Sequence, residues 1–531
     1  MRVKQAWCGA MMLAMAATPS AAQDPLSAID WLDRQSLADD DLALAPNAAR
    51  PSNAARPPGA GPSTKPAIAE PPVTRDARRP EITVRPLDEA TSDAVGLLPS
   101  HVTGFPQSLW QGSDAARLSD LMIAQNVDGQ PAMQSLLFAL LLAEALPPAQ
   151  SEGRFLMARV DRLIALGAVA QAAELLSQAH ADEDRDLYAR VLDLALLSGP
   201  GVSACEKLVE DPGMAPDLDT RVYCLAQGGQ WDLALTTLET GRALGDITAA
   251  RYSLLLAFLD PELASGLPAL PPSQRLTPLE YRLHEAIGEP VPTQRLPRAF
   301  ATDDLTGDSG WKAQIEAGER LVRAGALAEQ RLFAFYTLGR ASASGGVWDR
   351  VQAVQSFETA LQAGDVRATA TTLLAVWPMM VDNGLATAFA KTYARQLADL
   401  PLTGSAMAVY QQVALLSPDY ELLSRLMSPL GLHQKFAVAL AQGRPQEASA
   451  PTSRARAIAD GFTTPPPASL VALLDQDKLG EVILRAMSLA YQGYLGDETS
   501  LTEALATLRH VGLQDTARRM ALQALLLSAE G

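Results

Sequence analysis

Three segments of the sequence carry the same pattern: Leu156-x-x-Arg159-Val160-x-x-Leu163, Leu187-x-x-Arg190-Val191-x-x-Leu194 and Leu218-x-x-Arg221-Val222-x-x-Leu225. Successive segments are 31 residues apart. Because Leu, Val and Leu recur at positions i, i+4 and i+7, they fall on one face of a helix. A helical stripe that returns at a fixed period is typical of stacked helix pairs. The pattern therefore predicts an all-α fold, an α-solenoid of antiparallel helix pairs with a period of about 31 residues.

The composition of the chain favours the same fold class. Hydrophobic residues make up 48% of the 531 residues, but aromatic residues make up only 5%. A core of Leu, Ala and Val favours closely packed helices, because Ala and Leu have high helix propensity whereas strands favour aromatic and β-branched residues. The length allows two or three domains or one extended solenoid.

Two stretches within the repeated region have the form of a helical hairpin. Residues 163–179 and 225–238 each place a Gly turn between apolar helical segments, with Ala172 or Ala234 where the helices would cross. Over about half of its length the chain resembles tetratricopeptide-like helical-repeat proteins of the bacterial cell envelope, whose usual period is about 34 residues. This resemblance implies a binding scaffold and transfers no functional residue.

Residues 1–22 have the features of a secretory signal peptide. Arg2 and Lys4 precede an apolar run over residues 7–17, and small residues follow at 20–22. The run is too short to span a bilayer, and no later stretch qualifies as a transmembrane segment. We expect an exported, periplasmic protein rather than a secreted one. Its net charge of −17 becomes −19 without the two basic residues of the signal, which argues against nucleic acid as a partner.

The next two segments predict a tether. Residues 23–42 are acidic and contain four clustered large apolar residues, Leu26, Ile29, Trp31 and Leu32. They form either a disordered terminus or a short amphipathic segment that docks on a partner. Residues 43–80 are rich in Pro, Ala and Arg and predict a disordered linker, because they offer too few apolar side chains for a core.

The rest of the chain divides at its prolines. Residues 81–112 predict an extended segment that packs on the first helices. Its expected anchors are Leu97, Leu98, Phe105, Leu109 and Trp110. An N-terminal helical array is expected over residues 113–289, with Ser113 as its first N-cap. A proline-dense linker over 290–308 then precedes a C-terminal helical array over 309–531.

Two cysteines remain after the signal peptide. Cys205 and Cys224 lie at equal distances from a turn between Pro212 and Pro216, so antiparallel helices on either side would bring them to the same height. In an oxidising compartment this arrangement favours a disulfide. The alternative is that both are ordinary small core residues.

The repeated arginine is the strongest candidate for binding. Arg159, Arg190 and Arg221 lie beside the apolar stripe, and weaker copies of the pattern add Arg251 and Arg282. Stacked repeats would align these side chains in a row. The row either forms internal ion pairs with carboxylates of neighbouring repeats, or it is a positive stripe that receives an acidic partner. The overall acidity of the chain favours internal pairing.

No other motif supports chemistry. Gly307-Asp308-Ser309-Gly310 copies the nucleophile loop of serine proteases, but its place before an amphipathic segment predicts a helix N-cap at Asp308 or Ser309. Asp304, Thr306 and Asp308 begin a calcium-loop pattern that Ser309 and Ile315 break. The five histidines are scattered, so we predict no metal site and no cofactor.

These observations predict a non-enzymatic periplasmic scaffold or adaptor that binds proteins of the cell envelope. One alternative is an enzyme of cell-wall turnover, since some lytic transglycosylases resemble the chain in carrying a superhelical α-domain. Those enzymes have a catalytic Glu commonly followed by Ser, a pair that this sequence lacks. A second alternative is an Ala-rich structural surface protein, against which the amphipathic periodicity argues.

Overall fold

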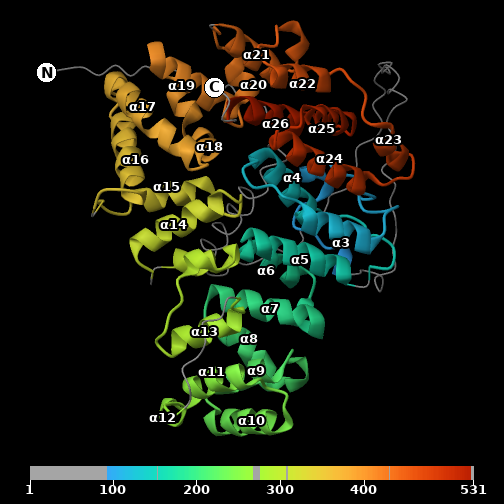
Figure 1. Cartoon of the computed structure of the whole chain (residues 1–531), viewed down its shortest axis with the longest axis vertical. Helices are drawn as coiled ribbons and strands as arrows, with labels where there is room; N and C mark the ends of the chain where they lie inside the picture. The colour runs from blue at the N-terminus through green and yellow to red at the C-terminus, as the bar shows by residue number, and fades with distance from the viewer. Residues whose placement is uncertain are drawn as a thin grey trace, which may run out of the picture.

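The protein is helical throughout the part of the chain that the structure describes. This computed structural model describes residues 92–151, 153–266, 275–306, 309–341, 343–429 and 431–527. These residues form packed helices and no β-strand (Figure 1), with two isolated bridges, Leu98 to Ala143 and Asp114 to Ala149. The expected signal peptide (1–22), acidic segment (23–42) and linker (43–80) lie outside the described residues, and so do Leu26, Ile29, Trp31 and Leu32.

The first half of the described chain contains the repeated stretch. Its helices are α2 (Ser100–Thr103), α3 (Ala115–Ala124), α4 (Pro131–Leu142), α5 (Arg154–Leu166), α6 (Val169–Gln178), α7 (Arg185–Ser198), α8 (Val202–Glu210), α9 (Leu218–Gln227), α10 (Trp231–Leu244), α11 (Ala249–Leu259), α12 (Pro261–Ala264) and α13 (Pro278–Ala286). Short 3-10 helices, η3 (Ser92–Ala94), η6 (Thr293–Arg295) and η7 (Arg298–Leu305), precede α2 and follow α13.

The second half is helical to its end. Its helices are α14 (Trp311–Val322), α15 (Glu329–Thr337), α16 (Val347–Gln362), α17 (Val366–Asp382), α18 (Ala386–Ala398), α19 (Gly404–Leu416), α20 (Tyr420–Ser424), α21 (Gly431–Ala441), α22 (Ser453–Gly461), α23 (Ala468–Leu474), α24 (Leu479–Tyr494), α25 (Glu498–His510) and α26 (Gln514–Leu526). No helix in the described ranges combines the length and the apolar character that a membrane crossing requires.

The repeated stripe lies on α5, α7 and α9, each the first helix of a packed pair. Leu156, Val160 and Leu163 are fully buried on α5, and their counterparts on α7 and α9 are buried or half-buried. Each helix from α5 to α11 packs against the next one along the chain. A glycine in the left-handed conformation, Gly167 (φ +85°), ends α5. A side chain there would lie 2.6 Å from Leu321 of α14, so this turn also requires glycine for close packing.

The helix pairs form two hydrophobic cores. The boundary between these cores does not fall at residues 290–308, where the sequence predicted a linker. The smaller core lies in the lobe of α7–α13, at the lower end of Figure 1, where α13 returns to pack on α7. The larger core contains residues from both halves of the chain, and Phe300 and Leu305 belong to it. The structure thus differs from the predicted linker, because η7 packs on α5, α7 and α14. The prolines of residues 290–308 interrupt the helices, but the apolar residues near them are buried.

The two ends of the described chain meet. α4 packs on α24 and α26, and α3 packs on α24, so blue and red helices lie side by side in Figure 1. The main-chain N–H of Ala132 donates to Gln523 Oε1 of α26 at 2.9 Å, and the N–H of Gly480 donates to the carbonyl of Leu109 at 3.0 Å. A Cβ at Gly480 would lie 2.4 Å from the Trp110 ring, so only glycine allows this approach.

The segment before α3 is less extended than the sequence predicts. Residues 92–94 form η3 and residues 100–103 form α2, with Leu98 bridging to Ala143 between them. The five expected anchor residues are all buried in the larger core: Leu97, Leu98, Phe105, Leu109 and Trp110. The N-cap of α3 is Asp114 rather than Ser113, because the Asp114 carboxylate accepts from the Arg117 N–H at 3.0 Å.

Candidate functional site: a groove where the two halves meet

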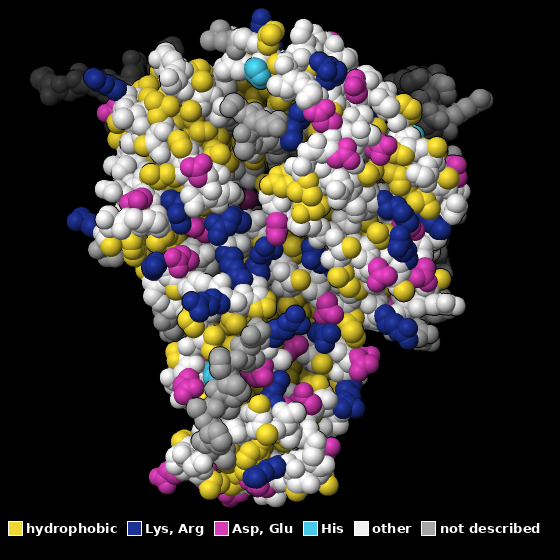
Figure 2. Space-filling model, in the orientation of Figure 1, with side chains coloured by type: hydrophobic (Ala, Val, Ile, Leu, Met, Phe, Trp, Pro, Cys, Tyr) yellow, Lys and Arg dark blue, Asp and Glu magenta, His cyan; other side chains and the backbone are white. Residues whose placement is uncertain are grey.

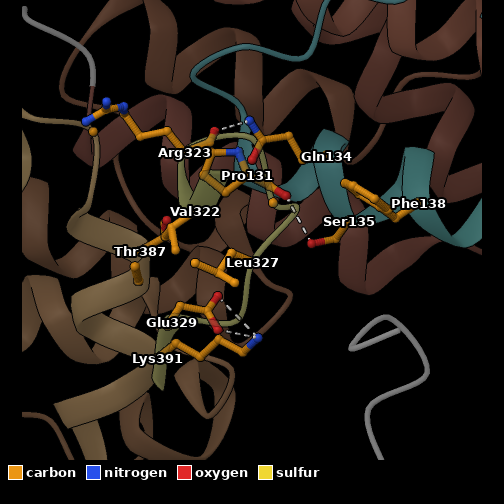
Figure 3. A pocket seen from close by; sticks show the side chains of 13 residues that line it. Pro131, Gln134, Ser135, Phe138, Val322, Arg323, Leu327, Glu329, Thr387 and Lys391 are labelled. Atoms are coloured by element: carbon orange, nitrogen blue, oxygen red, sulfur yellow. Dashed lines mark hydrogen bonds and ion pairs between the residues drawn. The ribbon is translucent and has the colours of Figure 1, made fainter. Parts of the chain in front are cut away.

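Two adjoining cavities lie between α4, the turn from α14 to α15, α18 and the C-terminal helices. Their shared edge is formed by Pro131, Arg323, Gly384 and Thr387. We call the two cavities together the central groove. Figure 3 shows its first cavity, with side chains from α4 facing those of α15 and α18.

Hydrogen bonds and ion pairs hold the walls of the first cavity in place. Gln134 of α4 donates to the carbonyl of Arg323 at 2.7 Å and to that of Val127 at 3.0 Å. The Lys391 ammonium of α18 lies 3.1 Å from the Glu329 carboxylate of α15 (Figure 3). The floor is apolar, because Phe138 is buried against Gly325. These contacts connect three elements that are far apart in the sequence, so the cavity has a defined shape.

The second cavity is mostly apolar and has a volume of about 200 Å³. Besides the shared edge, it is lined by residues from the turn before α4, from α17 and α18, and from the C-terminal helices: Gly129, Gln130, Val381, Ala386, Ala490, Tyr494, Leu501, Met520, Gln523, Ala524 and Leu527. Arg323 is its one Lys, Arg, Asp or Glu lining residue in the described chain. An apolar pocket of about 150 Å³ admits a benzene ring, so this cavity has room for a large apolar side chain.

Arg323 retains positive charge at the shared edge. Its side chain is 39% exposed, and one guanidinium nitrogen donates to the carbonyl of Asn383 at 3.3 Å. Its carboxylate contact, Glu319 at 3.5 Å, is buried and already accepts hydrogen bonds from Nε and Nη2 of Arg350 at 2.7 and 2.8 Å. Tyr336 donates to the same carboxylate at 2.7 Å. One negative charge is therefore shared by two arginines, which leaves a net charge of +1.

Other arginines extend this positive region away from the groove. Burial lowers the pKa of Arg320, and the nearby charges of Arg298 and Arg323 lower it further. Burial likewise lowers the pKa of Arg162, where Asp128 opposes the effect and Arg298 adds to it. Figure 2 shows Lys and Arg side chains gathered across the middle of the face, beside its hollow. An anionic group would be attracted to this part of an otherwise acidic protein.

The arginine row lies elsewhere, and Arg159 has no exposed surface. It is fully buried and donates to four main-chain carbonyls, those of Leu141 (2.7 Å), Val95 (2.7 Å), Ala143 (3.1 Å) and Asp93 (3.3 Å). Burial lowers the pKa of Arg159 to about 10, and the Asp93 charge opposes the shift. Arg159 therefore stays charged at neutral pH and is unavailable to a partner.

Three other members of the row form internal ion pairs. Arg190 lies 2.6 Å from Asp161 of α5. Arg251 contacts Glu280 at 3.1 Å and Asp219 at 3.7 Å, on the helices to either side. Arg282 contacts Asp303 and Glu285, both at 2.6 Å. These arginines therefore make the internal ion pairs that the sequence predicted as one of two alternatives, and they do not form a free positive stripe.

Arg221 differs from the others, because its buried Nε has no hydrogen-bond partner among the described residues. The row thus does not form one surface, and none of its members lines the central groove.

Cys205 of α8 and Cys224 of α9 form a disulfide, with their Cα atoms 4.7 Å apart. Both residues are buried in the smaller core. The bridge therefore joins two consecutive helices within the lobe of α7–α13.

The remaining motifs gain no chemical role. Asp308 lies outside the described residues, and the N-cap of α14 is Gly310, not Ser309. Asp304 accepts hydrogen bonds from Thr293 and Ser309, and Ile315 is buried in the core. No His, Cys, Asp and Glu cluster in the described ranges could hold a metal ion.

Sequence reasoning missed the groove. Arg323 follows an amphipathic helix and precedes a Gly turn, which is typical of a solvated helix end. Its role depends on Asn383 and Gly384, about 60 residues away, and on the α26 wall, and no periodicity connects these positions. A usable signal was Gly325, because a Gly after a helix predicts a turn; in the structure its φ is +73° and the turn packs close to α4.

Comparison with protein-family models, with curated proteins and with solved structures found no match.

Proposed function

We propose that this protein is a non-enzymatic scaffold or adaptor of the periplasm that binds a segment of another cell-envelope protein in the central groove. Its helix pairs would form a repeat framework of the α-solenoid type, like that of the tetratricopeptide-like proteins that the sequence resembles. The expected signal peptide at residues 1–22 supports export, and the packed pairs from α5 to α11 support a repeat framework.

One observation carries the proposal. The groove places an apolar cavity of about 200 Å³ beside Arg323, whose carboxylate partner Glu319 is already bound by Arg350. Apolar pockets with a few placed polar groups are the usual form of a binding site. A partner segment with a large apolar side chain next to an acidic group would fill the cavity and pair with Arg323.

Site-specific photocrosslinking in envelope extract tests this function. A benzophenone amino acid replaces Thr387 in the groove or, as the control, Thr236 on the exposed face of α10. We expect the groove position to capture a discrete envelope protein that the control does not capture. Arg323→Glu should abolish the capture, whereas Arg367→Glu, the same charge change at an exposed site on α17, should leave it intact. Equal capture from both positions would refute the groove as the binding site.

A further inference from the structure

We propose that residues 23–42 of the same chain occupy the central groove until a partner displaces them. This inference rests on the proposed function of the groove as a binding site. Residues 23–42 would compete with the partner for the groove and so lower the apparent affinity of the partner. Three features of the molecule support it: charge, apolar content and reach.

The charges of segment and groove are complementary. Residues 23–42 contain six aspartates and one arginine, a net charge of −5. The charged residues that line the groove are Arg323, Lys391 and Glu329, a net charge of +1. Arg320 adds to the positive potential next to it, whereas Arg298 is paired with Asp128 at 3.0 Å. In a chain of net charge −17, this region attracts an acidic segment, while most of the surface repels one.

The apolar residues of the segment match the second cavity. Trp31 lies between Asp30 and Asp33, so an indole in the cavity would place carboxylates next to its mouth. Val381, Ala490, Leu501 and Met520 give the cavity apolar walls, and Arg323 lies at its edge. Aromatic side chains contribute most of the binding energy in such contacts, because they bury a large area with few rotatable bonds.

The tether reaches the groove from a known starting point. Ser92 and Asp93 lie near the C-terminal end of α4, because Arg159 binds the carbonyls of Asp93, Leu141 and Ala143 together. The groove lies at the opposite end of α4, which has 12 residues and is about 18 Å long. Forty-nine residues, 43–91, separate the segment from Ser92, and about six residues of extended chain already cover 18 Å. The intervening chain is therefore long enough for the segment to reach the groove, and attachment to the same chain raises its effective concentration there.

An intramolecular crosslink tests the position of the segment in the full chain. A benzophenone amino acid replaces Trp31, and irradiation is followed by mass spectrometry of the monomer. We expect linked peptides from α4, α18 or α26, at a yield independent of protein concentration. The same amino acid at Asn47, in the linker, should give no such product. Links from position 31 to other surfaces, or links only between chains, would overturn the proposal.

Competition measured with a synthetic peptide of residues 23–42 provides a second readout. Ile29→Ala with Trp31→Ala in the full chain should open the groove and strengthen peptide binding at least tenfold relative to the wild type. Adding Arg323→Glu should remove this gain, whereas adding Arg367→Glu should not. Matching melting curves for the variants show that each is folded. Equal peptide affinity for wild type and double variant would overturn intramolecular docking.

The two proposals fail in different ways. If Thr387 captures an envelope partner but Trp31 forms no link to the groove, intramolecular docking is refuted and the adaptor function stands. If the capture from the groove depends on residues 23–42 being present, the segment binds the partner instead, and intramolecular docking is again refuted. If neither position forms a specific product, both proposals are wrong.

Discussion

Arg159 connects the ends of three segments through main-chain carbonyls. Leu141 and Ala143 lie at the C-terminus of α4, where carbonyls lack partners within the helix and the helix dipole favours a positive charge. Asp93 and Val95 supply the other two carbonyls. The Asp93 carboxylate in turn accepts from the N–H groups of Gly153 and Leu156 at 2.7 and 2.6 Å, at the start of α5. Arg159 therefore caps the C-terminus of α4, and the Asp93 carboxylate caps the N-terminus of α5.

Replacing Arg159 should destabilise the protein strongly. Arg159→Ala would leave several buried carbonyls without a donor, at a cost of about 1–3 kcal/mol for each unsatisfied group, so we expect a total loss above about 3 kcal/mol. Arg190→Ala is the matched control, because its pair with Asp161 is partly exposed and such pairs contribute less than about 1 kcal/mol. Urea unfolding measures both; equal losses would contradict the structural role of Arg159.

Asp193 should make stability depend on pH. Burial raises its pKa to about 6, Arg190 lowers it, and Asp161 and Asp217 raise it further. Because the folded pKa exceeds the ordinary value of 3.8, the folded state keeps a proton that the unfolded state loses. The contribution of Asp193 to stability therefore falls as the pH rises from about 4 to about 6.

Asp193→Asn removes this penalty. We expect the variant to be more stable than the wild type at pH 7, by on the order of 1–3 kcal/mol, with the difference vanishing near pH 4. Thermal unfolding from pH 4 to pH 8 measures it. A difference that does not change with pH would show that Asp193 is not held near its neutral form.

At the scale of the element, the disulfide should stabilise the lobe of α7–α13. The bridge closes a loop with a sequence separation of 19 residues between two helices of the smaller core. A loop of this size contributes about 3 kcal/mol by restricting the unfolded chain. Reduction, or Cys205→Ser with Cys224→Ser, should therefore lower the unfolding midpoint of α8–α11 in hydrogen exchange. An unchanged midpoint for these helices would refute the contribution.

The sequence predicted helices well where their apolar stripe repeats. Leu156, Val160 and Leu163 show why: a side chain every third or fourth residue must be buried, and burial leaves a period that a single sequence displays. Residues 290–308 show the opposite case. Their prolines indicated a linker, but Phe300 and Leu305 are buried by contacts with α5, α7 and α14. A high density of prolines predicts where helices end, but it does not predict which residues the intervening segment contacts.

The whole molecule depends on contacts that no local pattern encodes. Gln523 binds the main chain of Ala132, and Gly480 admits Trp110, across more than 350 positions of sequence. These contacts bring α4 against α24 and α26 and so create the second cavity of the groove. The sequence could predict neither the groove nor Arg323 as its edge, because no wall alone carries a pattern that places it beside the others.

Hydrogen exchange at increasing urea concentration tests the central claim, that both halves of the chain share one core and form the groove where they meet. If they do, the amides of α4 and α5 lose protection at the same urea concentration as those of α19, α24 and α26, in one transition. If residues 113–289 unfold as a unit while α14–α26 stay protected, the chain consists of two separate arrays, and the groove with its proposed occupants has no structural basis.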